Sequence, residues 1–186
     1  LREEFDAHFI NRITKAAESI SMEESIPVAL DWINGRRTPD ANQNLKGAIT
    51  NLNLGASAPH LFLSLIHSIC FGSKAIVNRF KEEGVEIAQI VGIGGVAKKS
   101  KFIMQTLADT LNMPVRVVES EQTPALGAGI YAALAAGLFS SYREASGVLG
   151  SKYIAEYHPN PSKVEIMKDL MKKYTKLGIS IENLTQ

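Results

Sequence analysis

The stretch that decides the fold runs from Ile87 to Glu119 and reads IAQIVGIGGVAKKSKFIMQTLADTLNMPVRVVE. Residues 87–93 have the β-branched, apolar character of a strand, and residues 114–118 predict a second strand. Between them, residues 99–111 carry apolar side chains at helical spacing. A helix that connects two strands in this way normally leaves them parallel, so the stretch predicts an α/β fold with helices packed on a sheet.

Working outward from this stretch, the apolar spacing predicts further helices and strands on both sides. Upstream we expect two neighbouring antiparallel strands, and downstream only helices. The expected helices are 3–20, 59–83, 123–137, 141–149 and 161–177, and the expected upstream strands are 26–33 and 46–54. We divide the chain into an N-terminal helical segment (1–25), a main domain (26–150) and a C-terminal helical extension (151–186).

The composition excludes several classes of protein. The 186 residues include 20 Lys and Arg against 19 Asp and Glu. This balance argues against a nucleic-acid-binding surface built on phosphate contacts and against a polybasic membrane anchor. One cysteine, Cys70, cannot form a disulfide framework, so a reducing, cytoplasmic location is expected.

Two features of chain organisation add to this. The uncharged run from Ala125 to Phe139 is too short to span a bilayer, and we expect it to form a buried helix. The chain opens LREE, which resembles neither a secretory signal nor a usual start, so we expect a piece of a longer protein.

A glycine-rich turn follows the first strand of the deciding stretch. Gly92, Gly94 and Ala97 spell G-x-G-x-x-A, with Gly95 inside the motif, and Glu119 ends the next strand. Glycine allows a ligand to approach the backbone closely, and a helix start offers free N–H groups to phosphate. The turn is therefore either part of a nucleotide site or a tight strand-to-helix turn without a ligand.

Lys98, Lys99 and Lys101 fall at the expected start of the helix after this turn. Cations there oppose the helix dipole, and a bound polyphosphate would remove the conflict. For any one of these lysines, however, a solvated surface position is the preferred explanation.

The residues indicate neither a catalytic group nor a metal site. The four histidines lack ligand spacing, and Cys70 lies on an apolar helix, where a core position is expected. Ser57 lacks the final glycine of a nucleophile elbow. From the residues alone, the chain is interpreted as a nucleotide-phosphate lobe.

Three stretches carry a family resemblance, namely ALDWINGRRTPDANQNLKG (29–47), GGVAKKS (94–100) and EQTPALGAG (121–129). Together they resemble the C-terminal domain of the FGGY carbohydrate kinases, over about residues 26–150. Many family members carry arginine where Leu63 stands and glutamate where His67 stands. In this departure the sequence resembles a branch of the family that acts on a ketopentose.

The resemblance implies an actin-like ATPase (ribonuclease H-like) lobe, whose mixed sheet has two antiparallel strands followed by βαβα. It implies that Gly94 and Gly95 match the adenosine-binding glycine pair and that Ala97, Lys98 and Lys99 belong to the cofactor-binding stretch after it. It implies ATP with Mg²⁺ held mainly by the other lobe. That N-terminal lobe would also carry most of the sugar site and the aspartate base, so this chain alone would be inactive.

Two other interpretations remain open at this point. A Rossmann-type dinucleotide domain of an oxidoreductase would use the G-x-G-x-x-A spelling and Glu119. A non-catalytic ATP-binding module would need only the lobe itself. We expect neither nucleic acid nor a membrane as a partner, and a homo-oligomer remains open.

Overall fold

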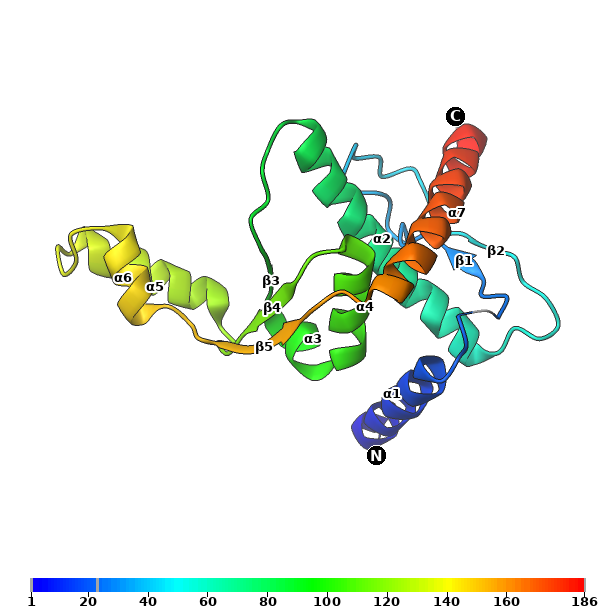
Figure 1. The fold of residues 1–186 in the computed structure, drawn as a ribbon, viewed down its shortest axis with the longest axis horizontal. Helices are drawn as coiled ribbons and strands as arrows, with labels where there is room; N and C mark the ends of the chain where they lie inside the picture. The colour runs from blue at the N-terminus through cyan, green and yellow to red at the C-terminus, as the bar shows by residue number, and fades with distance from the viewer. Residues whose placement is uncertain (1, 23, 186) are drawn as a thin grey trace. The chain divides into compact units, whose positions relative to one another are not determined.

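The computed structural model of the chain describes residues 2–22 and 24–185, and these form two compact units. The first unit comprises residues 1–87, 109–112 and 159–186, and the second comprises 88–108 and 113–158. Figure 1 labels the elements of both. In chain order they are α1 (Arg2–Glu18), β1 (Val28–Ala29), β2 (Ile49–Thr50), α2 (Ala58–Glu82), β3 (Ile90–Gly92), α3 (Gly94–Lys99), α4 (Lys101–Leu111), β4 (Val115–Val118), α5 (Thr123–Ala135), α6 (Tyr142–Leu149), β5 (Tyr153–Tyr157) and α7 (Pro161–Thr185).

The first unit is built around α2 and α7, which both contact β1 of the short β1–β2 pair. The two strands are antiparallel, as the sequence predicted, with Val28 opposite Thr50. Each is shorter than predicted, because the chain turns soon after β1 and Gly35 donates back to the Trp32 carbonyl at 3.1 Å. Its core is an apolar cluster of Val28, Leu30, Trp32, Leu45, Phe71, Met167 and Tyr174.

Local chemistry fixes where the long helices begin. α2 starts after Ser57 in extended conformation, and Pro59 occupies its first turn, where no N–H is needed. α7 starts at Pro161, and the Asn160 side chain accepts from the Ser162 N–H at 3.1 Å. Both helices begin within one residue of the predicted start. The end of α7 differs, because the helix continues to Thr185, beyond the predicted end at 177.

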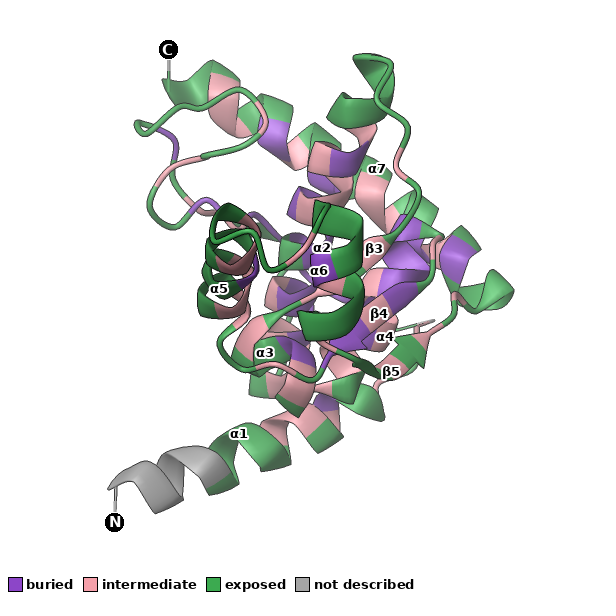
Figure 2. Ribbon diagram, turned by 90° about the vertical axis from the view of Figure 1, so that its left-hand side faces the viewer, coloured by how far each residue is buried: buried purple, intermediate pink, exposed green. Residues whose placement is uncertain are grey.

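The second unit contains a three-stranded sheet in the order β3-β4-β5. β3 and β4 are parallel, as predicted, and β4 is buried at Val115, Val117 and Val118 (Figure 2). β5 runs antiparallel to β4 and lies inside the segment expected to be a helical extension. A doubly wound Rossmann sheet continues with parallel strands on both sides, so β5 departs from that topology.

The charge-free helix α5 differs from the sequence expectation. The sequence predicts a buried helix, yet within Thr123–Ala135 only Ile130 is buried, and Tyr131 is 62% exposed. Its contacts are with α6, which is itself largely exposed in Figure 2. The run of apolar letters predicted the helix correctly, but it does not specify which element covers the helix.

One helix among the described residues, α2, is long and apolar enough to span a membrane by length and composition. In its most apolar window, 44% is buried inside the fold. Core helices of globular domains pass the same test, so this is weak evidence for a span.

Candidate functional site

The glycine turn lies at the edge of the sheet where both parallel strands end. β3 ends at Gly92 and β4 ends at Val118, and their carboxyl ends face the same side because the strands are parallel. In open α/β sheets, ligands bind outside the carboxyl ends of the strands. We use the name glycine turn for residues 93–96 and the name acidic turn for residues 119–122, the segment that follows β4.

The three glycines of the motif have different structural roles. A Cβ on Gly92 would lie 3.2 Å from the Ala97 Cβ and 3.3 Å from the Met104 sulfur, so this glycine allows α3 and α4 to pack against the strand. Gly94 has a φ of +82°, which strongly favours glycine. A Cβ on Gly95 would meet no atom within 4 Å. Bare backbone is therefore presented to open space at Gly94 and Gly95.

The lysines after the turn lie elsewhere on their helix than the sequence analysis expected. α3 ends at Lys99, and Ser100 adopts an extended conformation (φ −120°, ψ 94°) before α4 begins. Lys98 and Lys99 therefore occupy the last turn of a short helix, where cations favour the dipole. The expectation that Lys98 and Lys99 oppose a helix start was wrong, so they give no argument for phosphate, whereas Lys101 does begin α4 as expected.

The predicted cofactor-binding residues separate into three groups. Gly94 and Gly95 are open, and Lys99 is exposed. Ala97 is 5% exposed, so any ligand contact there would use its backbone. Lys98 reaches the acidic turn, where its Nζ donates to the Glu119 carbonyl and to Glu121 Oε1, each at 3.0 Å. The sequence analysis missed this contact, although Glu121 stands three residues after the end of β4.

The lysines of α3 favour the ionised form of Glu121 in the acidic turn. The hydrogen bond from Lys98, followed by the charge of the same lysine, lowers the pKa of Glu121, and Lys99 adds a smaller effect. The carboxylate is therefore ionised at neutral pH and remains paired with Lys98.

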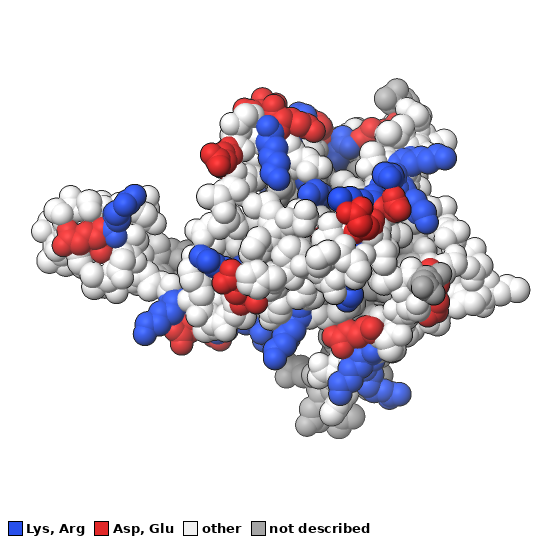
Figure 3. All heavy atoms as spheres, viewed as in Figure 1, with Lys and Arg blue, Asp and Glu red and all other residues white. Residues whose placement is uncertain are grey.

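Positive and negative side chains are interspersed over the face of the molecule shown in Figure 3. That view displays no large surface of one sign such as a duplex-binding protein requires. It agrees with the balanced composition.

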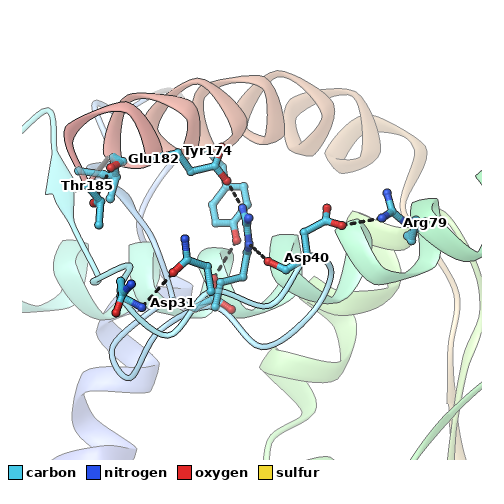
Figure 4. A network of polar contacts seen from close by, with 10 residues as sticks. Asp31, Asp40, Arg79, Tyr174, Glu182 and Thr185 are labelled. Carbon is cyan, nitrogen blue, oxygen red and sulfur yellow. Dashed lines mark hydrogen bonds and ion pairs between the residues drawn. The ribbon is translucent and has the colours of Figure 1, made fainter.

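A second polar cluster lies in the first unit, between the loop of residues 33–43 and helices α2 and α7 (Figure 4). Arg36 forms an ion pair with Glu182 of α7 and donates to the Asp40 carbonyl at 3.0 Å. Arg79 of α2 pairs with the Asp40 carboxylate at 2.5 Å. These contacts hold the loop between the two helices. The charged groups of the cluster are therefore already paired with one another and are not available to a ligand.

Asp31 is committed in the same way. The Tyr174 hydroxyl donates to its Oδ1 at 2.8 Å, and a Cβ on Gly72 would lie 2.5 Å from its Oδ2. Burial, and then the charge of Asp31, raises the pKa of Tyr174, so the phenol stays protonated and continues to donate. Asp31 is therefore a structural carboxylate and not a free base.

A serine, a histidine and a carboxylate line up at the start of α2. Ser57 Oγ lies 2.8 Å from His60 Nδ1, and His60 Nε2 lies 3.2 Å from Glu24 Oε2. The Ser57 N–H also points to Nδ1 at 3.4 Å, which completes a capping arrangement at the helix start. Pro59 removes one N–H that an oxyanion would need, so this line-up is a helix cap and not a nucleophile.

Cys70 is buried, as its place on an apolar helix predicted. Burial raises the pKa of Cys70 to about 12, so its thiol is protonated and unreactive. No group of three or more metal-ligating side chains occurs among the residues that the structure describes.

The comparison with known families separates the kinase interpretation from the Rossmann interpretation. The model of the FGGY family of carbohydrate kinases, C-terminal domain, matches residues 10–136. The chain belongs to this family. The match begins upstream of residue 26, the start of the resemblance in the sequence, and it gives the Rossmann interpretation no support.

Curated relatives of this FGGY chain include two ribulokinases. The ribulokinase of Vibrio parahaemolyticus is 41% identical over 184 residues, which is 99% of this chain and 32% of the relative. That of Bacillus licheniformis is 32% identical over 169 residues, 89% of this chain and 31% of the relative. The chain thus spans about a third of the length of the relatives it matches, and the similarity to the Vibrio relative extends beyond residues 26–150 at both ends.

Solved structures with the same fold include a xylulose kinase and a glycerol kinase. A ligand-bound xylulose kinase from Lactobacillus acidophilus has a TM-score of 0.82 at 21% identity, covering 91% of this chain and 34% of that one. Plasmodium falciparum glycerol kinase with ADP has a TM-score of 0.71 at 19% identity, covering 89% and 33%. At this identity the likeness concerns the fold, and it confirms the predicted actin-like fold class. The single mixed sheet that was predicted is instead two separate sheets, β1-β2 and β3-β4-β5.

Proposed function

We propose that this chain is the ATP-binding lobe of a ribulokinase, which transfers a phosphoryl group from ATP to the 5-hydroxyl of L-ribulose in L-arabinose catabolism. The 41% identity to a ribulokinase supports the sugar, and the family supports the reaction class. The solved glycerol kinase with ADP supports ATP as the donor. The single cysteine fits a cytoplasmic enzyme.

The observation that carries the proposal is the open glycine turn at the carboxyl edge of β3 and β4. Gly94 has a positive φ, and neither Gly94 nor Gly95 has an atom near the position of its missing Cβ. A nucleotide can therefore approach this backbone closely, with Lys99 exposed beside it to attract phosphate. Ala97 and Lys98 complete the proposed stretch. Mg²⁺ would accompany the phosphates and be held mainly by the other lobe.

The partner lobe must supply the groups that the reaction needs and that we do not assign to this chain. Phosphoryl transfer requires a residue that positions or deprotonates the attacking hydroxyl, and here Asp31 is already engaged by Tyr174. We assign the base and most of the sugar site to an N-terminal lobe in the full-length kinase. The isolated chain would then behave as a non-catalytic ATP-binding module.

Gly95→Val in the full-length kinase tests this function. Because Gly95 lacks the positive φ of Gly94 and has free space around it, valine should leave the fold intact and obstruct only a ligand. We expect the KM for ATP to rise about tenfold or more, since a loss of about 1.4 kcal/mol in binding is a factor of ten. The KM for L-ribulose should change little.

Gly147→Val is the matched control, because Gly147 of α6 also has open space and no positive φ. Steady-state kinetics with each substrate varied in turn provide the measurement, after melting temperatures show that both variants fold. An unchanged KM for ATP in Gly95→Val would leave this glycine as a turn residue only and remove the proposed site. Calorimetric titration of the chain with ADP and with NAD would expose a dinucleotide domain if NAD bound more tightly.

A further inference from the structure

Lys98 connects the two turns at the edge of the second unit's sheet. Its Nζ donates to the backbone carbonyl of Glu119 and to the side chain of Glu121, both at 3.0 Å. Its side chain is 24% exposed, whereas that of Glu121 is 78% exposed. The ammonium is therefore oriented towards the protein, and two of its three donors are already used.

The acidic turn is anchored differently on its two sides. On the β5 side, Glu119 N–H donates to the Lys152 carbonyl at 2.8 Å and Ser120 N–H donates to Ser151 Oγ at 2.9 Å. On the α3 side, the hydrogen bonds found among the described residues come from Lys98. Loss of Lys98 would leave this side of the turn free to move away from the glycine turn.

We propose that Lys98 is a positioning residue, which holds the acidic turn beside the glycine turn and so sets the spacing of the two turns at the proposed nucleotide site. Lys99, which is exposed, then supplies the charge that faces the phosphates. This inference rests on the proposed function. It differs from a direct phosphate contact by Lys98, because a lysine with two protein acceptors contributes mainly through the geometry it fixes.

The two roles of Lys98 predict opposite effects of removing Glu121. If Lys98 contacted phosphate directly, Glu121→Ala would free the ammonium and remove a nearby negative charge, so ATP would bind at least as well. If Lys98 holds the turn, Glu121→Ala removes one of its two anchors, and ATP should bind less well. The sign of the change in KM therefore separates the two roles.

The experiment is a double-mutant cycle in the full-length kinase with Lys98→Met, Glu121→Ala and the combined variant, measured by steady-state kinetics. Each single variant should raise the KM for ATP about two- to fivefold, the range expected from one exposed ion pair, with kcat and the KM for L-ribulose nearly unchanged. The combined variant should be no worse than Lys98→Met, because both changes break the same contact. Lys98→Arg, which keeps the donors, should restore the KM to within about twofold of wild type.

A KM for ATP that falls or stays constant in Glu121→Ala would overturn the positioning role. So would additive losses in the combined variant. The outcome remains separate from the test of the proposed function. If Gly95→Val and Lys99→Met raise the KM while Glu121→Ala does not, the nucleotide site stands and the positioning role fails. If Gly95→Val and Lys99→Met both leave the KM unchanged, the nucleotide site itself fails.

Discussion

His67 and Cys70 lie close together on the buried face of α2, and burial shifts the pKa of each side chain in the direction that favours its neutral form. The pKa of Cys70 rises to about 12, and that of His67 falls to about 4. His67 is 4% exposed and packs near the Phe71 ring, with 6.0 Å between ring centroids. These two side chains contribute to the core as uncharged groups of moderate size.

His67 should make stability depend on pH in a defined window. An unfolded histidine has a pKa near 6.5, so below that pH the unfolded state binds a proton that folded His67 refuses. The contribution of His67 to the free energy of unfolding is therefore fully present above pH 6.5. It is lost as the pH drops towards 4, by up to about 3 kcal/mol. Urea titrations between pH 4.5 and 7 would measure this slope, above the range in which most carboxylates titrate.

His67→Leu is the control for that measurement, since leucine keeps an apolar side chain of similar size at the same buried position. The variant should lose most of the dependence between pH 4.5 and 6.5. A slope equal to that of the wild type would mean that other groups cause it.

At the scale of elements, the docking of α7 depends on one residue without a side chain. A Cβ on Gly178 would lie 2.9 Å from Cη2 of Trp32, which is too close for an ordinary contact. The rigid indole ring has little room to move away. Trp32 is held in turn by Tyr174, whose ring crosses it nearly edge-on at 6.5 Å. Gly178→Ala should therefore lower the free energy of unfolding by about 1–3 kcal/mol through overpacking.

The free energy of unfolding of Gly178→Ala is to be measured by urea titration against Ser180→Ala, an exposed position two residues later on the same helix. Because alanine is a better helix former than either glycine or serine, propensity alone would stabilise both variants. A Gly178→Ala protein as stable as wild type would show that the ring can shift away.

Elements were predictable where periodicity was strong, and less so where contacts decide. The spacing in 59–83 and 161–177 predicted α2 and most of α7, because an apolar stripe is written in the chain itself. β5 was missed, because five residues before a proline-rich break carry little pattern and the strand exists through its pairing with β4. The break between α3 and α4 at Ser100 was missed for a similar reason, since the apolar pattern continues across it.

The glycine turn was located from the sequence, because glycine spelling and strand order both appear in the letters. The partner of Lys98 was not, since sequence separation conceals that Glu119 and Glu121 come next to α3. The cluster of Arg36 with Glu182 is further still from view, because its members are 146 positions apart.

At the scale of the whole molecule, we propose a nucleotide-binding turn on this chain and assign the base for phosphoryl transfer to the N-terminal lobe. We expect no phosphorylation of L-ribulose by the isolated chain with ATP and magnesium. A coupled ADP-release assay measures this, with the full-length kinase as the positive control. Turnover in the usual kinase range of roughly 1–100 per second would show that the lobe needs no partner.

The close packing of Trp32 against Gly178 has a practical consequence, because the chain contains one tryptophan. The indole lies beneath the Arg36 guanidinium, 5.0 Å from its carbon to the ring centroid, and is 6% exposed. Its fluorescence emission therefore reports, without any added dye, whether α7 is seated on the loop of residues 33–43. A red-shifted spectrum on titration with denaturant would mark the moment when the C-terminal helix leaves the indole, and stopped-flow mixing would time that event against the loss of helical circular dichroism.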